Sequence, residues 1–541
     1  MAVSVLGDKY AKADFTFGEP TNLGPVVNSQ HDEQHPSITG DGLEIYFMSR
    51  RPGGTGDWDI WSARRETIHD SWAEPTNAGP TVNSSGEDWA PCISSDGLEL
   101  YFEANRPGGY GGTDILVASR KTIDEPWGNP VNLGAVVNSS NRDGGPNISF
   151  DGLELYFKSN RPGGYGGEDL WVSRRQTKDE PWQNPVNLGS IVNSPDWDRE
   201  PSISSDGLVL FFSSVRTGSL DLWLTSRKTK DGTWGEPVDL GPGVNKTYTE
   251  DGVSISADGR TLYFSDYYYN DIRPGGHGGA DLYKVSINPI VDFNGDGIVD
   301  SADMCIMVDH WGEDYSLCDI GPMPWGNGVV DVEDLKVLAE HLFEEVDDPT
   351  LVAHWPLDET EGMFAADSVG NGINDAFVVG GAAWQPDSGQ IDGALELNGV
   401  DGCAIAGEVL NPAEGNFSVV AWIKGGAPGQ VVLSQTDASN WLTVDAEGNL
   451  MTELKCTGRS AGPLYCETVI TDGQWHRIGL VWDGSHRTLY VDGIIVAEDT
   501  PNGLCESNSG LYIGCGKNME PGTYFSGLID DVRIYNRAVS P

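Results

Sequence analysis

Short runs of alternating apolar and polar residues recur along the first 289 residues, separated by turn-forming residues. The clearest runs are LEIYF, LELYF, LELYF, LVLFF and TLYF, and each closely follows an Asp-Gly pair. Alternation with a period of two predicts half-buried β-strands, and Asp-Gly and Gly-Gly predict tight turns between them. The Asp-Gly pairs are spaced by 55, 55, 55 and 52 residues and begin at Asp41, Asp96, Asp151, Asp206 and Asp258.

Each repeat predicts about four strands, which is typical of a propeller blade. A third element of the WGNPVNLG type separates the repeats. Its first copy, at residues 17–29, precedes the first Asp-Gly unit, whereas no copy follows the fifth unit at residues 253–287. The N-terminal segment is therefore expected to supply the missing strand of the last blade and to remove an open edge. We predict a five-bladed β-propeller over residues 15–289, preceded by an N-terminal extension at residues 1–14.

The repeat resembles the WD-like β-propeller repeat of the TolB type. The shared signature is a strand, then Ser-x-Asp-Gly, then an apolar strand ending in Tyr-Phe, as in SISSDGLVLFF. This resemblance implies a fold and leaves the activity open, because such propellers serve both as binding scaffolds and beside enzymes.

One acidic column recurs three residues before the proline, or in the last blade the valine, that opens each repeat. Five acids at equivalent blade positions form a ring, which we interpret either as a cation or sugar site or as a set of blade-locking ion pairs with the repeated arginines. Irregular residues near the ring, such as His35 and Arg142, differ from blade to blade, and Trp89 and Trp197 are candidates for stacking on sugars. The ring acids are Glu33, Asp88, Asp143, Asp198 and Glu250.

Residues 292–303 follow the EF-hand pattern of a calcium loop. A glycine at the sixth position permits the sharp turn, and an apolar helical pattern follows the loop. Asp303 stands at the twelfth position in place of the usual Glu. The candidate Ca²⁺ ligands are Asp292, Asn294, Asp296, the Ile298 carbonyl, Asp300 and Asp303.

A second, degenerate copy of this loop follows, and the two together resemble a type I dockerin at residues 290–348. In the second copy, Asn327, Asp331 and Asp334 occupy matching positions, and Asp319 supplies the first acid only through a four-residue insertion. The resemblance implies Ca²⁺ as cofactor, a small α-helical EF-hand-type module and a cohesin-like partner. A calcium-stiffened spacer between the flanking domains is the alternative.

The chain becomes β-patterned again, without repeats, over residues 349–541, which predicts a jelly-roll sandwich. The segments HWPLDETEG, FSVVAWIKG and FSGLIDDVRIYNRAVS resemble laminin-G-like, concanavalin A-type domains. That resemblance implies glycan or protein binding and candidate metal ligands at Asp367, Asp530 and Asp531. Trp384, Trp441, Tyr465 and Trp475 are candidates for a sugar platform. The whole chain is thus expected to be mainly β.

Charge and cysteine content indicate the compartment. With 33 basic and 82 acidic residues, the net charge of −49 argues against nucleic-acid binding and favours cations. There is no long apolar run for a membrane span, and no leader peptide is expected in this chain. Seven of the eight cysteines follow residue 300, which favours an oxidising, extracellular or cell-surface location. The predicted disulfide pairs are Cys305–Cys318, Cys456–Cys466 and Cys505–Cys515.

These observations support three hypotheses. The first is a calcium-dependent multi-module protein that binds polysaccharide or glycoprotein. The second is a glycoside hydrolase with its active site in the propeller and the jelly roll as a carbohydrate-binding module, although no residue is assigned a catalytic role. The third is a structural protein of the cell envelope.

Overall fold

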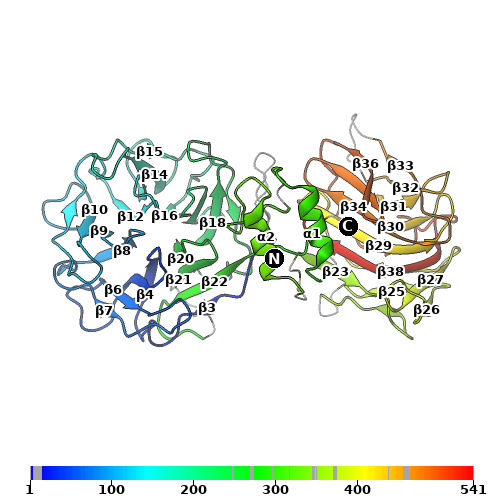
Figure 1. Ribbon diagram of the computed structural model, residues 1–541, viewed down its shortest axis with the longest axis horizontal. Helices are drawn as coiled ribbons and strands as arrows, with labels where there is room; N and C mark the ends of the chain where they lie inside the picture. Colours follow the sequence, from blue (N-terminus) through cyan, green and yellow to red (C-terminus); the bar gives the residue numbers. More distant parts are fainter. Residues whose placement is uncertain are drawn as a thin grey trace. The chain divides into compact units, whose positions relative to one another are not determined.

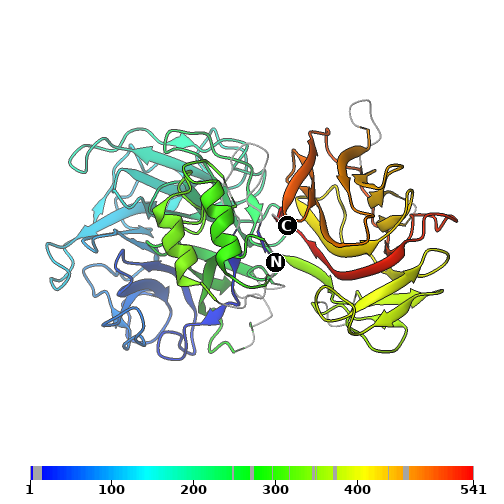
Figure 2. The ribbon, with the colours of Figure 1, turned by 45° about the vertical axis from the view of Figure 1, so that its right-hand side comes forward.

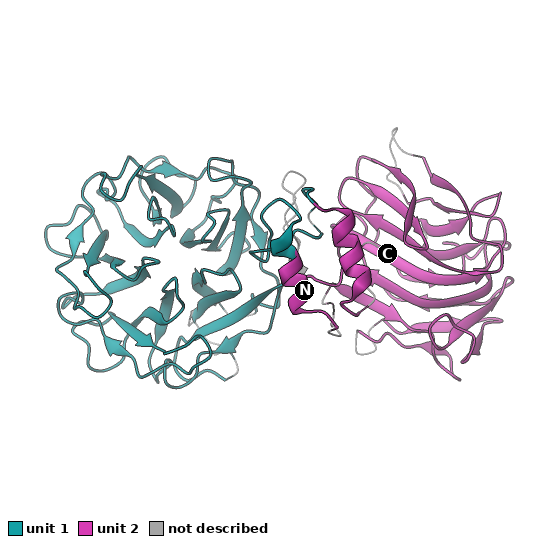
Figure 3. Cartoon of the chain, viewed as in Figure 1, with its two compact units in different colours: residues 1, 3–289, 312–334 teal, residues 2, 290–311, 335–541 magenta. Residues whose placement is uncertain are grey.

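The computed structural model describes residues 2–3, 15–246, 249–267, 273, 275–294, 297–315, 317–343, 348, 350–369, 374–436, 438–454 and 462–539. The chain forms two compact units (Figure 3). The propeller unit contains residues 1, 3–289 and 312–334, and the jelly-roll unit contains residues 2, 290–311 and 335–541. The segment at 290–348, predicted to be a separate module, is therefore shared between the two units.

The propeller unit consists of five small antiparallel sheets arranged around a ring (Figure 1). This confirms the predicted five-bladed propeller. Blade 1 contains β4 (Glu33–Ile38), β5 (Glu44–Ser49), β6 (Asp59–Arg64) and β7 (Thr76–Asn77); blade 2 contains β8 (Asp88–Ile93), β9 (Glu99–Ala104), β10 (Asp114–Ser119) and β11 (Val131–Asn132). Blade 3 contains β12 (Asp143–Ile148), β13 (Glu154–Ser159), β14 (Asp169–Arg174) and β15 (Val186–Asn187); blade 4 contains β16 (Asp198–Ile203), β17 (Val209–Ser214), β18 (Asp221–Ser226) and β19 (Val238–Asp239). Blade 5 contains β20 (Thr249–Ile255), β21 (Thr261–Tyr267), β22 (Leu282–Pro289) and β3 (Thr21–Asn22), and the sheet extends to β2 (Phe15–Phe17) and β1 (Ala2–Val3).

The ring closes as the sequence predicts. β3, from the start of the chain, pairs with β22 at its end, with Asn22 opposite Tyr283. The same pairing joins the outer strands of blade 2, where Asn132 lies opposite Leu116. Closure pairs the outer edge of the last blade within the chain.

Alternating side chains of neighbouring blades form the propeller core. One buried cluster contains Tyr46 and Ile60 of blade 1 together with Leu100 and Phe102 of blade 2. Burying each such side chain stabilises the fold by roughly 1.5–3 kcal/mol, so the blades are held together mainly by packing between sheets.

Two nine-residue helices occupy the segment between propeller and jelly roll, α1 (Ser301–Asp309) and α2 (Val332–Glu340). The helical patterns after the two acidic loops are therefore confirmed. Asp300 caps α1, and the side chain of Asp303 accepts the backbone N–H of Asp300 in return, which forms a capping box. None of the helices in the described ranges has the length and apolar character that crossing a bilayer requires.

The jelly-roll unit contains two antiparallel sheets of eight strands each (Figure 2). One sheet consists of β23 (Leu351–Trp355), β26 (Ala383–Gln385), β27 (Ala394–Asn398), β29 (Phe417–Gly425), β34 (Trp475–Trp482), β35 (Arg487–Val491), β36 (Ile494–Asp499) and β38 (Ser526–Tyr535). The other consists of β24 (Phe364–Ala365), β25 (Ala376–Val379), β28 (Cys403–Ala406), β30 (Val431–Gln435), β31 (Asn440–Val444), β32 (Asn449–Thr452), β33 (Leu464–Val469) and β37 (Leu511–Ile513).

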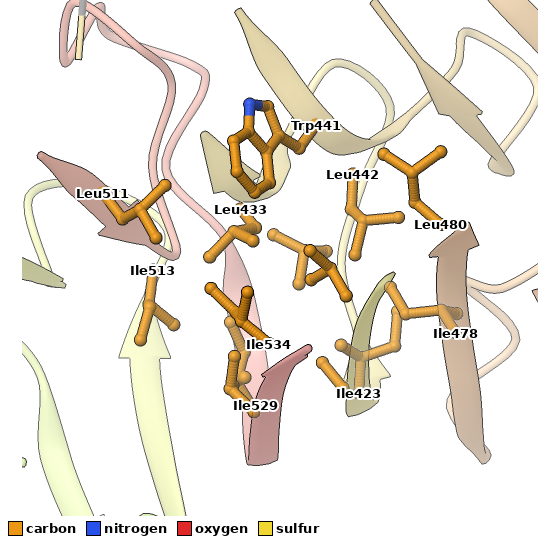
Figure 4. Close-up of a cluster of buried hydrophobic side chains, with 14 of the residues drawn as sticks. Ile423, Leu433, Trp441, Leu442, Ile478, Leu480, Leu511, Ile513, Ile529 and Ile534 are labelled. Atoms are coloured by element: carbon orange, nitrogen blue, oxygen red, sulfur yellow. The ribbon is translucent and has the colours of Figure 1, made fainter. Parts of the chain in front are cut away.

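The facing side chains of these two sheets form one large core (Figure 4). Along β29, the alternate residues Phe417, Val419, Ala421 and Ile423 point into it, as a half-buried strand requires. Trp441 lies fully buried in the same core, so it is unavailable as part of the sugar platform predicted from the sequence.

Candidate functional site

All five ring acids are fully buried and ion-paired, each with the arginine at the equivalent position of its own blade. A carboxylate oxygen of each acid also accepts a backbone N–H four residues earlier, for example that of Ser194 for Asp198 at 2.6 Å. Arg216 continues from Asp198 to the carbonyl of Val192 in the connection between blades 3 and 4. This geometry matches the interpretation of the ring as blade locks and corrects its interpretation as a channel site, because buried, paired carboxylates are not available to a ligand. The pairs are Glu33–Arg51 (3.0 Å), Asp88–Arg106 (2.6 Å), Asp143–Arg161 (2.5 Å), Asp198–Arg216 (2.7 Å) and Glu250–Arg273 (2.5 Å).

A β-bulge follows each ring acid and turns the next residues into the mouth of the central channel. The innermost strand of each blade shifts register there, as between Arg199 and Ser202. The residue two positions after each acid has a positive φ, between 45° and 59°. His35 and Glu200 occupy this position in blades 1 and 4. For residues other than glycine, this backbone conformation costs about 1–3 kcal/mol. Strained backbone of this kind clusters at functional sites.

These bulges contribute to a pocket of about 460 Å³ at one end of the propeller channel. No ring acid lines it. Trp89 does, as the sequence predicts, whereas Trp197 is 52% exposed outside the pocket. The lining residues are Asp32, Gln34, His35, Met48, Arg50, Trp58, Trp89, Glu103, Arg142, Lys158, Arg199, Glu200 and Asp251.

Seven charged side chains form a continuous chain across this pocket and draw on all five blades. Positive and negative groups alternate along it, with His35 as one of the positive positions. The successive contacts are Arg142–Glu103 (3.9 Å), Glu103–Lys158 (3.2 Å), Lys158–Glu200 (2.5 Å), Glu200–His35 (3.5 Å), His35–Asp251 (3.6 Å) and Asp251–Arg199 (3.0 Å). Each carboxylate in this chain of charges therefore lies between two cationic groups.

Glycines make room for this chain of charges. A Cβ atom on Gly144 would collide with the carboxylate of Glu103, and one on Gly252 would lie 2.5 Å from the His35 ring. Gly252 also has a φ of 59°, which glycine adopts without strain. The charged groups can therefore approach one another only because blades 3 and 5 carry glycine where other blades carry side chains.

The environment fixes the protonation states. Burial favours the neutral form of Glu103, but Lys158 and Arg142 lower the pKa of Glu103 below its ordinary value. Burial lowers the pKa of His35, yet Glu200 and Asp251 outweigh it and raise that pKa. Burial also raises the pKa of Asp251, and Arg199 and His35 bring it well below normal. The pocket is thus a set of fixed, compensated charges near neutral pH.

The residue just before each ring acid varies between blades and lies at the rim of the pocket or beside it. Three of these rim residues lie over the glycine-rich loop of the preceding blade: a Cβ on Gly279 would collide with Asp32, one on Gly167 with Trp197, and one on Gly112 would be 2.9 Å from Arg142. The repeated glycines thus accommodate rim side chains of different chemistry. Arg50, beside Asp32 at 3.3 Å, lies over the ring of Trp58 at 4.4 Å.

Below the pocket the channel narrows. A cavity of about 20 Å³ lies between the five inner strands, next to the prolines of blades 1 to 4 and Val253 of blade 5, and is lined by His35 and Glu200 among others. That volume accommodates about one water molecule. The contact of His35 with Glu200 therefore forms a floor, and a ligand of sugar size would be held in the mouth of the channel.

The first loop predicted to bind calcium, at residues 292–303, belongs to the jelly-roll unit. Asp292 and Asp303 are buried, and each accepts backbone N–H groups of the loop, Asp292 from Gly297 and Asp303 from Phe293 and Asn294. Ile298, whose carbonyl is a predicted ligand, is 46% exposed. Asp296 lies outside the described residues. Among the residues that are described, no group of three or more His, Cys, Asp or Glu side chains is placed to hold a metal ion.

The second loop, in the propeller unit, repeats this arrangement. Asp334 accepts the N–H groups of Ile320 and Gly321, as Asp303 does in the first loop. Asp319 accepts those of Asn327 and Gly328, across the inserted residues. Asp331 caps α2 through the N–H of Glu333, as Asp300 caps α1.

The second loop contains buried carboxylates, although none of the described acids form a group of three placed to hold a metal ion. Burial raises the pKa of Asp319 to about 6 and also raises that of Asp334, and each carboxylate repels the other's ionised form or that of a neighbouring acid. Two buried carboxylates in one oxygen-rich loop are in the environment that a bound Ca²⁺ would stabilise. Asp319, Asn327, Asp331 and Asp334 would hold it.

The three jelly-roll acids predicted to bind metal fall into two groups. Asp531 contacts His354 at 2.7 Å and Arg533 at 3.0 Å, and Asp367 accepts the backbone N–H of His354. Asp530 accepts two backbone N–H groups with one oxygen, whereas its other oxygen is buried without a hydrogen-bond partner in the described chain. Burial raises the pKa of Asp530 to about 7. Asp531 and Asp367 are thus engaged by His354, and Asp530 alone keeps an oxygen available.

The cysteines differ from the predicted pairs. Cys305 is an exposed free thiol on α1 and Cys318 is buried, so that bridge is not formed. Cys456 lies outside the described residues. The Cys515 thiol hydrogen-bonds with the thiol of Cys403 and not with Cys505. β28 and β37 are adjacent strands, whereas residue 505 lies in the loop before β37.

Comparison with known proteins supports the C-terminal prediction. Residues 397–541 match the family described as the concanavalin A-like lectin/glucanases superfamily. No curated protein matches the chain.

Several solved structures show a distant similarity. A sialidase of Trypanosoma rangeli in complex with the inhibitor DANA is 15% identical with a TM-score of 0.41, over 100% of this chain and 96% of that one. Domain 4 of AbnA, a GH43 extracellular arabinanase of Geobacillus stearothermophilus solved with arabinotriose, is 20% identical with a TM-score of 0.27, over 36% of this chain and 96% of that one. At TM-scores this low, the similarity says nothing about the function of this chain. The TolB-like and dockerin-like resemblances stay predictions, and the chain combines a five-bladed propeller with a concanavalin A-like jelly roll.

Proposed function

We propose that this protein is an extracellular or cell-surface multi-module protein that binds polysaccharide or the glycans of glycoproteins. The observation that carries the proposal is the pocket of about 460 Å³ at the propeller mouth. It combines fixed charged and polar groups with the aromatic side chain of Trp89. Sugars present both hydroxyl groups and apolar ring faces, and a site with a few convergent polar groups and aromatic side chains suits both.

The protonation states in the pocket favour binding over hydrolysis. Glycoside hydrolysis uses one carboxyl group with a raised pKa as general acid and a second carboxylate as base or nucleophile. In this pocket the pKa values of Glu103 and Asp251 are lowered, and cationic groups contact every carboxylate of the chain of charges. Carboxylates that are held ionised in this way are poorly suited to protonate a ligand.

Calcium is the cofactor of this proposal. Two loops with the same arrangement of a buried first acid, a glycine turn and a buried last acid support one Ca²⁺ in each. The ion would supply positive charge to the buried acids and fix the loops on which α1 and α2 begin. A cohesin-like partner or a role as a stiffened spacer both remain consistent with this assignment.

Titration calorimetry with Ca²⁺ tests the cofactor. We expect the intact chain to bind two Ca²⁺ ions in these loops and Asp334→Asn to lose one, because Asp334 is the last acid of the second loop. Ser204→Ala, which changes a turn of blade 4, is the control. A stoichiometry that Asp334→Asn leaves unchanged would contradict the assignment.

A glycan array on the intact protein, with and without EDTA, tests the function, with reducing-sugar release measured on every glycan that binds. Binding without release is the expected result. If the protein binds none of the glycans on the array, the proposal is overturned.

A glycoside hydrolase is the second candidate, favoured by one observation. Glu200 and Asp251 contact the two nitrogens of the His35 ring, at 3.5 and 3.6 Å. Flanking one imidazole places the two carboxylates near the ~5–9 Å separation found in such enzymes. This candidate would be the function if the wild type releases sugar and Asp251→Asn abolishes the release while glycan binding persists.

A further inference from the structure

We propose that the propeller pocket selects sugars that carry a carboxylate, and that Arg142 is the residue that pairs with it. The inference rests on the proposed glycan binding and adds the class of ligand. It is based on how closely carboxylates approach each cation of the pocket: some cations are firmly paired and one is not, in a protein whose net charge is −49.

Arg142 is the most weakly paired cation of the pocket. Its guanidinium lies 3.9 Å from Glu103, a distance beyond a hydrogen bond, and its side chain is 55% exposed. Glu103 is already paired with Lys158 at 3.2 Å. By contrast, Arg50 has carboxylates of Asp32 and Asp57 at 3.3 Å each.

The chain of charges as a whole also leaves a positive end. It begins with Arg142, ends with Arg199 and contains three carboxylates between four positive positions. Arg199 is held by Asp251 at 3.0 Å, and Lys158 is shared by two glutamates. Arg142 is therefore the exposed cationic end of this chain of charges.

The structure also holds the base of the Arg142 side chain in place. Its backbone N–H donates to the side chain of Asn160 at 2.9 Å, and its Cγ lies over Gly112, where a side chain would leave it too little room. An arginine guanidinium binds a planar carboxylate through two parallel hydrogen bonds.

An aromatic surface lies close by. Trp89 of β8 pairs with Glu103 of β9 in the register of blade 2, and Glu103 is the acid next to Arg142. A pyranose ring stacked on Trp89 would then direct a carboxylate substituent toward Arg142. Uronic acid residues combine such a ring with a carboxylate.

The test compares probes that differ only in this charge. Short oligosaccharides of galacturonate, mannuronate and glucuronate, and the methyl ester of each, are titrated into the intact protein at a constant free Ca²⁺ concentration. We expect at least one acid to bind about tenfold or more tightly than its ester. Arg142→Gln should remove this preference and leave binding of the ester unchanged.

Arg174→Gln is the matched control. Arg174 is 41% exposed, lies outside the pocket and pairs with Glu154, which Arg227 also holds. It should keep the preference for the acid. Equal binding of acid and ester by the wild type, or a preference that Arg142→Gln retains, would overturn the inference.

The outcome separates this inference from the proposed function. Binding of neutral glycans that Trp89→Ala abolishes, without preference for any acid, would overturn the carboxylate inference and leave the glycan-binding function standing. Absence of binding to all acidic and neutral glycans would overturn both.

Discussion

Replacing Lys158 by Met tests whether the chain of charges holds the pocket together. The Lys158 side chain is 10% exposed and bridges Glu103 and Glu200, which are 2% and 6% exposed. Removing one partner of a buried ion pair costs about 3–5 kcal/mol, because the other charge stays buried. Arg142 and His35 remain as partial partners of the two glutamates. We therefore expect the lower end, about 3 kcal/mol of unfolding free energy.

The assay is urea unfolding of the intact chain followed by pulse proteolysis, which reports the propeller separately from the jelly roll. Lys178→Met is the control, because Lys178 and Asp96 form an ion pair at 3.3 Å with both side chains more than 40% exposed. Exposed pairs contribute about 0–1 kcal/mol. A loss for Lys158→Met no larger than that of the control would refute the reasoning.

The pH dependence is a second readout of the same variant. The pKa of Glu103 is lowered in the folded protein, so its stabilising contribution is present above the ordinary glutamate pKa and is lost as the pH falls. Lys158→Met removes the main cause of that shift. The stability difference between wild type and variant should therefore shrink as the pH falls from about 7 to about 4. A difference independent of pH would contradict the assigned charges.

Three further outcomes follow from the contacts. Asp143→Asn should cost the propeller about 3 kcal/mol in the same unfolding assay, because it leaves Arg161, which is only 12% exposed, without its carboxylate; a loss below ~1 kcal/mol would contradict the blade-lock assignment. His35→Gln should destabilise more at about pH 5.5 than at about pH 9, because the raised pKa makes the contribution of His35 present below its unfolded pKa and lost as the pH rises through the folded one; equal losses at both pH values would exclude a charged His35. In the oxidised protein, peptide mapping without reduction should find Cys403 linked to Cys515, and a Cys515 peptide linked elsewhere would contradict the observed contact.

The propeller was predictable because its signals are local and repeated. Asp-Gly turns, period-two strands and the displaced first copy of the third element specify both the blades and the closure by β3. The same regularity led to the interpretation of the ring acids as a channel site, which was wrong. Residues of the same charge in every blade, such as Asp143 and Arg161, serve the packing that every blade needs.

Glu103, Lys158 and Glu200 were not predicted, because they belong to columns of the repeat that change from blade to blade. Glu103 and Lys158 occupy one equivalent position on β9 and β13, where blade 1 has Met48. Glu200 occupies the bulge position of His35. Comparing the repeats column by column for charge would have found them. Their partners across the channel depend on bulge geometry, which sequence alone does not specify.

The predicted pairing of Cys505 with Cys515 was wrong for a related reason. Spacing along the chain favoured residues 505 and 515, but strand order brings β28 beside β37. Gly514 has a φ of 88°, and a Cβ there would collide with the core residue Leu397. This turn of the backbone places Cys515 on the same side of the sheet as Cys403. Contacts between strands distant in sequence are outside the reach of spacing arguments.

The affinity of Trp89→Ala for the tightest glycan of the wild type tests the central claim most directly. Trp197→Ala is the matched control, since Trp197 is an exposed tryptophan of the same propeller outside the pocket. Loss of an aromatic stacking surface should weaken binding about tenfold in Trp89→Ala and leave Trp197→Ala near the wild type. Equal affinities for the wild type and Trp89→Ala would show that the glycan binds elsewhere on the protein and contradict the assignment of the pocket.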